Sequence, residues 1–136
     1  DAAWSVMTGV NPKSILAVNT DGNAMDEVVG DFNALGLWLW NAGAWAQLGP
    51  LTTESLVRCD VNGDNADEIV GDFGALGAWI YQAGAWTQID NRNPDIIVIA
   101  DVDGDGADEV LLDLGTLGLW EWNNAPAVQI SPMNLE

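Results

Sequence analysis

The sequence contains no histidine, one cysteine and only three basic residues. Without histidine the chain lacks the commonest general base and metal ligand near neutral pH, so Ser-His and Cys-His catalytic arrangements are excluded. A cation site in this protein must therefore be built from oxygen atoms. Only a carboxylate pair could perform hydrolysis. The carboxylates recur along the chain, which favours repeated binding over one asymmetric active site, so we expect no enzyme activity.

Cys59 has no second cysteine to pair with, so we expect a buried thiol and no internal disulfide. No apolar run reaches the roughly 18 residues of a membrane span, and we expect no membrane insertion. The shortage of basic residues leaves a net charge of −18. That balance argues against binding to nucleic acid or to anionic membranes. With 49% hydrophobic residues, the chain can still bury a core.

The acidic residues are concentrated in three nine-residue stretches, which hold twelve of the 21 acids. The strongest stretch is Asp-Val-Asp-Gly-Asp-Gly-Ala-Asp-Glu at 101–109, followed by related stretches at 60–68 and 19–27. Carboxylates at alternate positions of a curled loop point at one centre and would repel one another without a cation. A hard divalent ion with 6–8 oxygen ligands, above all Ca²⁺, relieves that repulsion. We call these stretches loops 1, 2 and 3 in chain order and number their positions 1–9.

The three loops belong to a repeat of 41 residues that covers the chain. After each loop come an Asp, a Leu-Gly pair, two rings two residues apart, a further Trp in the first two repeats, and a Gln. The columns are Asp31, Asp72 and Asp113; Leu35-Gly36, Leu76-Gly77 and Leu117-Gly118; Trp38/Trp40, Trp79/Tyr81 and Trp120/Trp122; Trp45, Trp86 and Ala127; Gln47, Gln88 and Gln129. We expect the column of Asp residues to cap the turn that contains the glycine.

Each repeat predicts four short β-strands and no helix. The predicted first strands of the three repeats are 15–18, 56–59 and 96–100, and the second strands are 27–32, 68–73 and 109–114. The third strands are 37–40, 78–81 and 119–122, and the fourth strands are 45–48, 86–89 and 128–130. Apolar residues fall on both faces of the third strand, which suits sheets stacked between neighbours. We therefore predict an all-β fold of three propeller-like blades, each of four antiparallel strands. A β-trefoil is the alternative.

We divide the chain into repeats at 14–54, 55–95 and 96–136, preceded by a partial repeat at 1–13. Trp4–Met7 then corresponds to a fourth strand without the rest of its blade. Three blades are too few for a ring of the usual 4–8. We thus expect either an excerpt of a longer propeller or self-association as a dimer, ring or filament.

At these residues the chain resembles the FG-GAP/VCBS repeat family, which includes the integrin α propeller. The resemblance covers all three units and implies Ca²⁺ binding by side chains at loop positions 1, 3, 5 and 9 and the carbonyl at position 7. The implied ligands are Asp101, Asp103, Asp105, Ala107 and Glu109; Asp60, Asn62, Asp64, Ala66 and Glu68; Asn19, Asp21, Asn23, Met25 and Glu27. The family usually has Asp at position 9, so Asp26, Asp67 and Asp108 at position 8 are alternative closing ligands.

The EF-hand, the rival interpretation, needs a bidentate Glu at position 12 and flanking helices. Position 12 is Gly30, Gly71 or Leu112, so we reject it. Up to three Ca²⁺ ions are expected, with affinity falling from loop 3 to loop 1, because loop 1 has Asn at positions 1 and 5. We expect their role to be structural, since metal-binding free energy becomes folding free energy.

Eight Trp residues leave two interpretations open. Trp38, Trp79 and Trp120 favour packing between blades. Trp40, Tyr81 and Trp122 are candidates for stacking on a sugar, as in propeller lectins. Our expectation is an extracellular or cell-surface module with a structural, adhesive or self-assembly role, whose partners are its own copies or a protein ligand; the alternative is a lectin with a glycan ligand.

Overall fold

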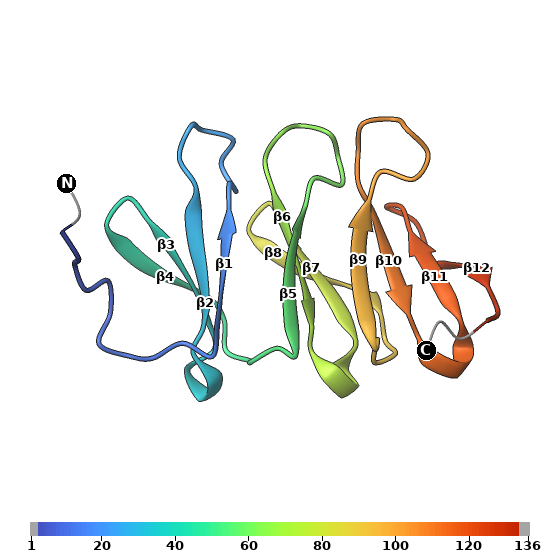
Figure 1. The fold of residues 1–136 in the computed structure, drawn as a ribbon, viewed down its shortest axis with the longest axis horizontal. Coiled ribbons are helices and arrows are strands. Elements are labelled where there is room, and N and C mark those ends of the chain that lie inside the picture. The colour runs from blue at the N-terminus through green and yellow to red at the C-terminus, as the bar shows by residue number, and fades with distance from the viewer. Residues whose placement is uncertain (1–2, 134–136) are drawn as a thin grey trace.

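The computed structural model describes residues 3–133, which form an all-β fold of three antiparallel four-stranded sheets in a row (Figure 1). Sheet A contains β1 (Ser14–Val18), β2 (Glu27–Asp31), β3 (Leu37–Asn41) and β4 (Ala44–Gly49). Sheet B contains β5 (Ser55–Cys59), β6 (Glu68–Asp72), β7 (Ala78–Gln82) and β8 (Ala85–Asp90). Sheet C contains β9 (Ile96–Ala100), β10 (Glu109–Asp113), β11 (Leu119–Trp122) and β12 (Val128–Ser131). The predicted all-β class and the predicted four antiparallel strands in each repeat are confirmed, with strand ends within two residues of their expected positions.

Every sheet is a meander in which each strand pairs with the next one along the chain. The register repeats as well, because Gly30 pairs with Trp38 in sheet A and Gly71 pairs with Trp79 in sheet B. A bulge follows the first residue of the third strand in all three sheets. Each 41-residue repeat therefore folds as one sheet, and the sequence columns become columns in space.

The Leu-Gly column forms a one-turn 3₁₀ helix between the second and third strands. These turns are η1 (Asn33–Leu35), η2 (Gly74–Leu76) and η3 (Gly115–Leu117). Gly36 follows η1 with φ of 80°, and a Cβ there would lie 2.1 Å from the Gly49 carbonyl oxygen. Since no side chain fits at that distance, the glycine is required. The Leu35 carbonyl accepts the Trp38 Nε1–H (2.8 Å) and the Gln47 Nε2–H (3.3 Å), which explains two further columns.

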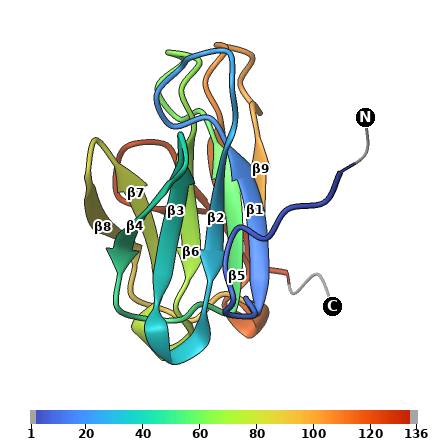
Figure 2. The same cartoon turned by 90° about the vertical axis from the view of Figure 1, so that its left-hand side faces the viewer.

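The hydrophobic core lies between the sheets. Between sheets A and B it is centred on Val18, Val29 and Ile69, and between sheets B and C on a larger group that includes Val70, Ile80 and Leu112. The first strands β1, β5 and β9 lie next to one another, while β4 and β8 lie on the opposite side (Figure 2). Both faces of sheet B are therefore covered, whereas sheets A and C each keep one outer face open (Figure 1).

The strand expected at Trp4–Met7 is not formed: residues 3–7 have no strand assignment. Trp4 is 100% exposed and Val6 is 85% exposed. The physical reason is that a strand needs a hydrogen-bonded neighbour, and the fourth position of sheet C is already taken by β12. In the part of the chain that the structure describes, no helix has the length and apolar character needed to cross a membrane.

Candidate functional site: three acidic loops

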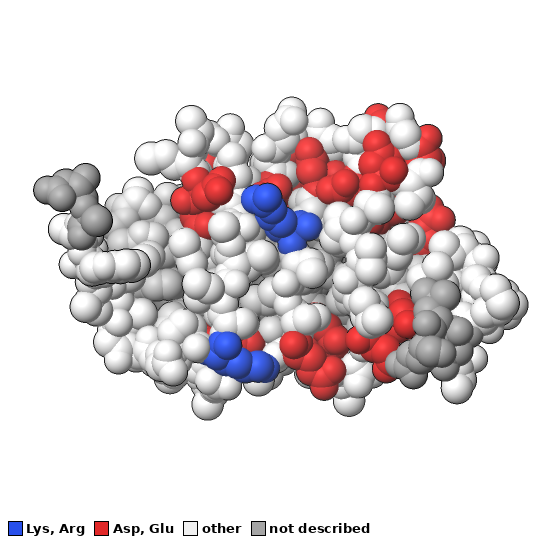
Figure 3. Space-filling view, viewed as in Figure 1, with Lys and Arg blue, Asp and Glu red and all other residues white. Residues whose placement is uncertain are grey.

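The three acidic loops connect the first and second strands of their sheets, and all three project from the same edge of the molecule (Figure 1). Acidic side chains line this edge in the space-filling view (Figure 3). The sequence repeat required one loop per sheet. The alignment of the loops along one edge comes from the stacking of the sheets.

Loop 3 brings Asp101, Asp103 and Glu109 together, with one carboxylate oxygen from each lying within 4.8 Å of the others. The loop curls because its carboxylates accept backbone N–H groups: Asp101 Oδ1 from Gly104 (2.6 Å), and Asp105 Oδ1 from Ala107 (2.9 Å). Asp101 Oδ2 also accepts the Gly106 N–H (3.0 Å), so both oxygens of this carboxylate help to close the loop. Glu109 is fully buried, and its Oε2 accepts the Val102 N–H (2.8 Å).

Two loop oxygens fit a cation because they are buried without a hydrogen-bond partner in the described structure. One is Glu109 Oε1 at position 9 of loop 3, and the other is Asn19 Oδ1 at position 1 of loop 1. An unpartnered buried oxygen costs roughly 1–3 kcal/mol. A hard cation coordinated by carboxylate and carbonyl oxygens would satisfy such atoms. The donor sets of the loops therefore suit Ca²⁺.

Loops 2 and 1 have progressively less free carboxylate. In loop 2, the Asn62 amide donates to Glu68 Oε1 at 3.1 Å, so this oxygen already has a partner. In loop 1, the Asn23 amide donates to Asp21 Oδ2 at 2.7 Å, and Asn19 Nδ2 donates to the Asn23 carbonyl at 2.7 Å. In loops 1 and 2, amide groups of the loop itself therefore satisfy part of the oxygen atoms that an ion would satisfy in loop 3.

Position 9 and position 8 have different roles. The Glu side chain at position 9 turns back into its own loop: Glu27, Glu68 and Glu109 are buried, and each accepts the N–H at position 2. The Asp at position 8 reaches the preceding loop instead. Asp67 Oδ2 accepts the Asn19 N–H (2.8 Å), and Asp108 Oδ2 accepts the Asp60 N–H (2.8 Å).

The main chain completes this contact. The Asp67 N–H donates to the Asn19 carbonyl (2.6 Å), and the Asp108 N–H donates to the Asp60 carbonyl (2.7 Å). We call this pair of hydrogen bonds, from position 8 of one loop to position 1 of the preceding loop, the inter-loop clasp. Sequence reasoning missed it. The only available signal was the unbroken Asp column at position 8, beside a Glu that sufficed to close the loop.

Burial also shapes the acid–base properties of this edge. Burial raises the pKa of Glu68, and the nearby charges of Asp64, Asp60 and Asp67 add to the effect. A carboxyl with a raised pKa carries an electrostatic cost when ionised, which a bound cation would offset. Burial likewise raises the pKa of the Cys59 thiol, with acidic neighbours contributing. As expected, this thiol is free and buried.

The aromatic candidates occupy different environments. Tyr81 packs into the core between sheets A and B, and Trp122 packs into the core between sheets B and C. Trp40 is half-buried and lies 5.3 Å from Trp45 between ring centroids. Tyr81 also lines a cleft of about 470 Å³ together with Asn62, Asp64 and other loop 2 residues.

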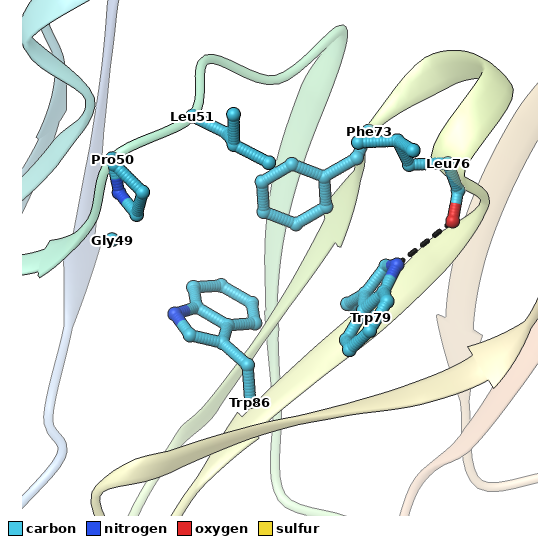
Figure 4. Close-up of a pocket in the computed structure, with 7 residues that line it drawn as sticks. All are labelled: Gly49, Pro50, Leu51, Phe73, Leu76, Trp79 and Trp86. Carbon is cyan, nitrogen blue, oxygen red and sulfur yellow. Dashed lines mark hydrogen bonds between the residues drawn. The ribbon is translucent and has the colours of Figure 1, made fainter.

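A smaller apolar pocket of about 160 Å³ lies where the connection from sheet A crosses sheet B (Figure 4). Trp79 and Trp86 lie on one side of it, and Leu51 and Phe73 lie on the other, with Pro50 at its edge. Trp79 Nε1 donates to the Leu76 carbonyl at 2.8 Å. A pocket of about 210 Å³ occupies the corresponding place on sheet A and includes Trp38 and Trp45.

Sheet C departs from this pattern because Ala127 replaces the third Trp. Arg92 lies over the Trp120 ring at 4.0 Å and donates to both carboxylate oxygens of Asp90 (2.8 and 2.6 Å). Burial alone would raise the pKa of Asp90, but the hydrogen bonds from Arg92 outweigh it and lower that pKa.

Comparisons of the sequence with protein-family models and with curated proteins gave no match.

Proposed function

We propose that this chain is an extracellular, calcium-stapled repeat scaffold of the propeller type, with a structural, adhesive or self-assembly role. One observation supports the proposal most directly: loop 3 gathers three carboxylates within 4.8 Å, and one buried oxygen among them has no hydrogen-bond partner. The resemblance to FG-GAP/VCBS repeats points the same way, since the motif spans all three units.

Asp101, Asp103, Asp105, the Ala107 carbonyl and Glu109 would hold the ion in loop 3. Other contacts within the chain hold the loop in the shape that the ion would bind. The Asx hydrogen bonds preform the loop, and Glu109 anchors the loop end to Val102 beside β9. The bound ion would neutralise carboxylates that otherwise repel one another, so that its binding free energy adds to the stability of the fold.

A binding role fits the side chains better than catalysis does. Within residues 3–133 the acidic groups of loops 1, 2 and 3 recur along one edge, and Tyr81, Trp122 and Trp79 pack in cores or line an apolar pocket. The chain has no histidine to act as a general base. We therefore propose that the protein is not an enzyme.

The test is thermal unfolding of the chain in EDTA, in excess Ca²⁺ and in excess Mg²⁺. We expect Ca²⁺ to raise the midpoint well above its value in EDTA, with a smaller rise in Mg²⁺, because Mg²⁺ demands octahedral geometry and loses its water reluctantly. The Glu109→Gln variant should lose most of the Ca²⁺ effect. An identical melting curve in EDTA and in Ca²⁺ would rule out the staple.

A second candidate function, a lectin, is favoured by one cleft. Tyr81 lines the cleft of about 470 Å³ together with Asn62, Asp64 and Gln82. Sugars bind where an aromatic face adjoins polar groups. A glycan-binding screen with the Tyr81→Ala variant as control tests this role, and a screen without hits that depend on Tyr81 would remove it.

A further inference from the structure

The two ends of the stack are complementary halves of an interface that the chain already makes twice. Sheet A contacts sheet B, and sheet B contacts sheet C, through the same repeat positions. The outer face of sheet C carries the positions that sheet B uses toward sheet C. The outer face of sheet A carries the positions that sheet B uses toward sheet A. The two outer faces therefore have the same repeat positions as the two faces that meet inside the stack.

The outer face of sheet C, which we call the C-end face, presents Val98, Leu111 and Ile130. These correspond to Val57, Val70 and Ile89, all of which pack in the core between sheets B and C. Without a neighbouring sheet, Val98 is 50% exposed and Ile130 is 47% exposed.

The outer face of sheet A, which we call the N-end face, presents Ile15, Val28 and Trp40. These correspond to Leu56, Ile69 and Tyr81, which pack in the core between sheets A and B. Ile15 is 69% exposed, whereas Ile69 at the position of Val28 is fully buried. Each end face thus leaves apolar side chains uncovered that are covered everywhere else in the repeat.

The inter-loop clasp is also incomplete at both ends, in opposite senses. Asp26 has the position of Asp67 and Asp108, but no acidic loop precedes loop 1 among residues 3–133. Its carboxylate accepts no hydrogen bond within the described residues, and its side chain is exposed. At the other end, Asp101 has the position of Asn19 and Asp60, and its backbone N–H and carbonyl have no partner from a following loop among residues 3–133. One end offers what the other end lacks.

From this complementarity we propose that the chain assembles head to tail: the C-end face of one copy packs on the N-end face of a second copy, and Asp26 of the second copy clasps Asp101 of the first. The occupant of each end face is a second copy of this chain. The partner's Asp26 carboxylate accepts the Asp101 N–H, and the partner's Asp26 N–H donates to the Asp101 carbonyl. This proposal rests on the scaffold role proposed above and specifies its partner.

Residues 3–7 must give way for the second copy to dock. Trp45 Nε1 donates to the Met7 carbonyl (3.2 Å) as Trp86 Nε1 donates to the Leu48 carbonyl of β4 (2.9 Å). Met7 therefore occupies the place that Ile130 of β12 takes in a docked copy. Because β12 is paired with β11 and residues 3–7 form no strand, the N-terminal residues are the ones displaced.

Glu121 on the outer face of sheet C opposes docking. It takes the position of Leu39 and Ile80, which are apolar and pack in the two intersheet cores. A carboxylate facing an apolar sheet pays a desolvation cost. The Glu121→Leu variant restores the residue type that the repeat has elsewhere and should therefore strengthen the assembly roughly tenfold or more.

The experiment measures the mass of the chain in solution by sedimentation equilibrium in Ca²⁺, over a range of concentrations. We expect the wild-type chain to exceed its single-chain mass of 14.5 kDa as concentration rises. Asp26→Asn should weaken association by roughly tenfold to a hundredfold, the worth of a hydrogen bond to a charged group. Its melting midpoint as a single chain should not change, because Asp26 has no hydrogen bond within the described residues.

A mixing experiment then tests the head-to-tail arrangement. Asp26→Asn weakens the N-end face, and Leu111→Glu disables the C-end face, so each variant alone should associate more weakly than the wild-type chain at the same concentration. Mixed together they should form a 1:1 complex, because one variant keeps its C-end face and the other keeps its N-end face. A symmetric interface would not be rescued by mixing, and the absence of a mixed complex would overturn the proposal.

The control is Asp67→Asn, the same substitution in a clasp within the chain. It should lower the melting midpoint and leave the end faces able to associate. The assembly is overturned if both the wild-type chain and the Glu121→Leu variant keep single-chain mass at every concentration. Calcium dependence is measured separately. A melting curve that does not respond to Ca²⁺, with assembly intact, would contradict only the proposed structural role of the ion. A melting curve that responds to Ca²⁺, with no assembly, would contradict only the assembly.

Discussion

The Asp67 and Asn19 residues of consecutive loops are joined by two hydrogen bonds that run in opposite directions. Asn19 N–H donates to the Asp67 carboxylate at 2.8 Å, and Asp67 N–H donates to the Asn19 carbonyl at 2.6 Å. The pair recurs between Asp108 and Asp60. These contacts link neighbouring sheets at the edge that carries the candidate metal sites, so loop geometry and sheet stacking are mechanically coupled.

The first prediction concerns the clasp itself. Asp67→Ala should lower the stability of the chain by about 1.5–3 kcal/mol, because a charged acceptor is lost and the Asn19 N–H remains without its partner. Urea unfolding of the chain measures the effect. Asp26→Ala, the same change at a position without a clasp, is the matched control and should leave the unfolding midpoint in place. Equal midpoints for Asp67→Ala and the wild-type chain would contradict the energetic role of the clasp.

A second prediction concerns the order of the metal sites. Microcalorimetry should detect the tightest Ca²⁺ binding at loop 3, weaker binding at loop 2 and the weakest at loop 1. Loop 3 has carboxylates at positions 1, 3 and 5, whereas loop 1 satisfies its amides internally. Glu109→Gln should remove the strongest binding event, and Glu27→Gln only the weakest. Three equal sites, or loss of the same event in both variants, would refute this order.

The third prediction is a contrast between two aspartates at the same repeat position. Burial alone would raise the pKa of Asp31, but hydrogen bonds from Thr53, Thr52 and Asn33 outweigh it and hold that pKa below its ordinary value of 3.8. For Asp72, burial raises the pKa, because a single hydrogen bond from Gly74 does not compensate. The two side chains are 0% and 4% exposed, so the difference lies in their partners.

The sign of the pH dependence follows from those directions. The stabilisation by Asp31 is complete above its unfolded pKa and is lost as the pH falls through its lower folded pKa. The contribution of Asp72 has the opposite sign, since ionisation costs stability as the pH rises through its raised folded pKa. At pH 7, Asp31→Asn should therefore cost about 2 kcal/mol, while Asp72→Asn should cost less or stabilise. Chemical unfolding of both variants at pH 7 measures the contrast, and equal costs of the two substitutions at that pH would contradict it.

A fourth prediction concerns Arg92, which lies over the Trp120 ring in sheet C. Arg92→Ala removes the stacking on Trp120 and leaves the buried Asp90 carboxylate without its bidentate donor. We expect a loss of about 1–3 kcal/mol in unfolding free energy. Arg58→Ala is the control: Arg58 is exposed and lies 3.8 Å from Asp67, so its ion pair should contribute close to nothing. A similar effect of both substitutions would show that net charge, not the contact, is responsible.

Most of the fold could be predicted because it repeats. Strand and turn positions followed from apolar columns and from Gly36, Gly77 and Gly118, each of which the backbone requires for steric reasons. The prediction for Asp31, Asp72 and Asp113 is also confirmed, since each accepts the N–H two residues ahead (3.0, 2.8 and 2.9 Å). The prediction of a strand at Trp4–Met7 was wrong for the single chain, because the sequence pattern does not reveal whether a pairing partner exists.

The candidate site was predictable only in part. The alternation of acids predicted three loops that turn on themselves, and the structure has them. The choice between positions 8 and 9 was open in sequence, because both residues are carboxylic acids one residue apart. In the structure they point to different places: Glu109 into its own loop, and Asp108 to the loop before it. That difference depends on a neighbouring sheet, which is 41 residues distant in the chain.

By itself, the sequence determined the 41-residue unit, the four strands in each unit and the acidic loop between the first two. These are local properties: period-two burial, glycine conformation and short-range hydrogen bonding by Asp side chains set them within a few residues. Only the tertiary structure decided which face of each sheet meets the next, that the position-8 aspartates clasp the preceding loop, and that the two ends of the stack are left open. Those features arise from packing between units, which contacts within one unit do not specify.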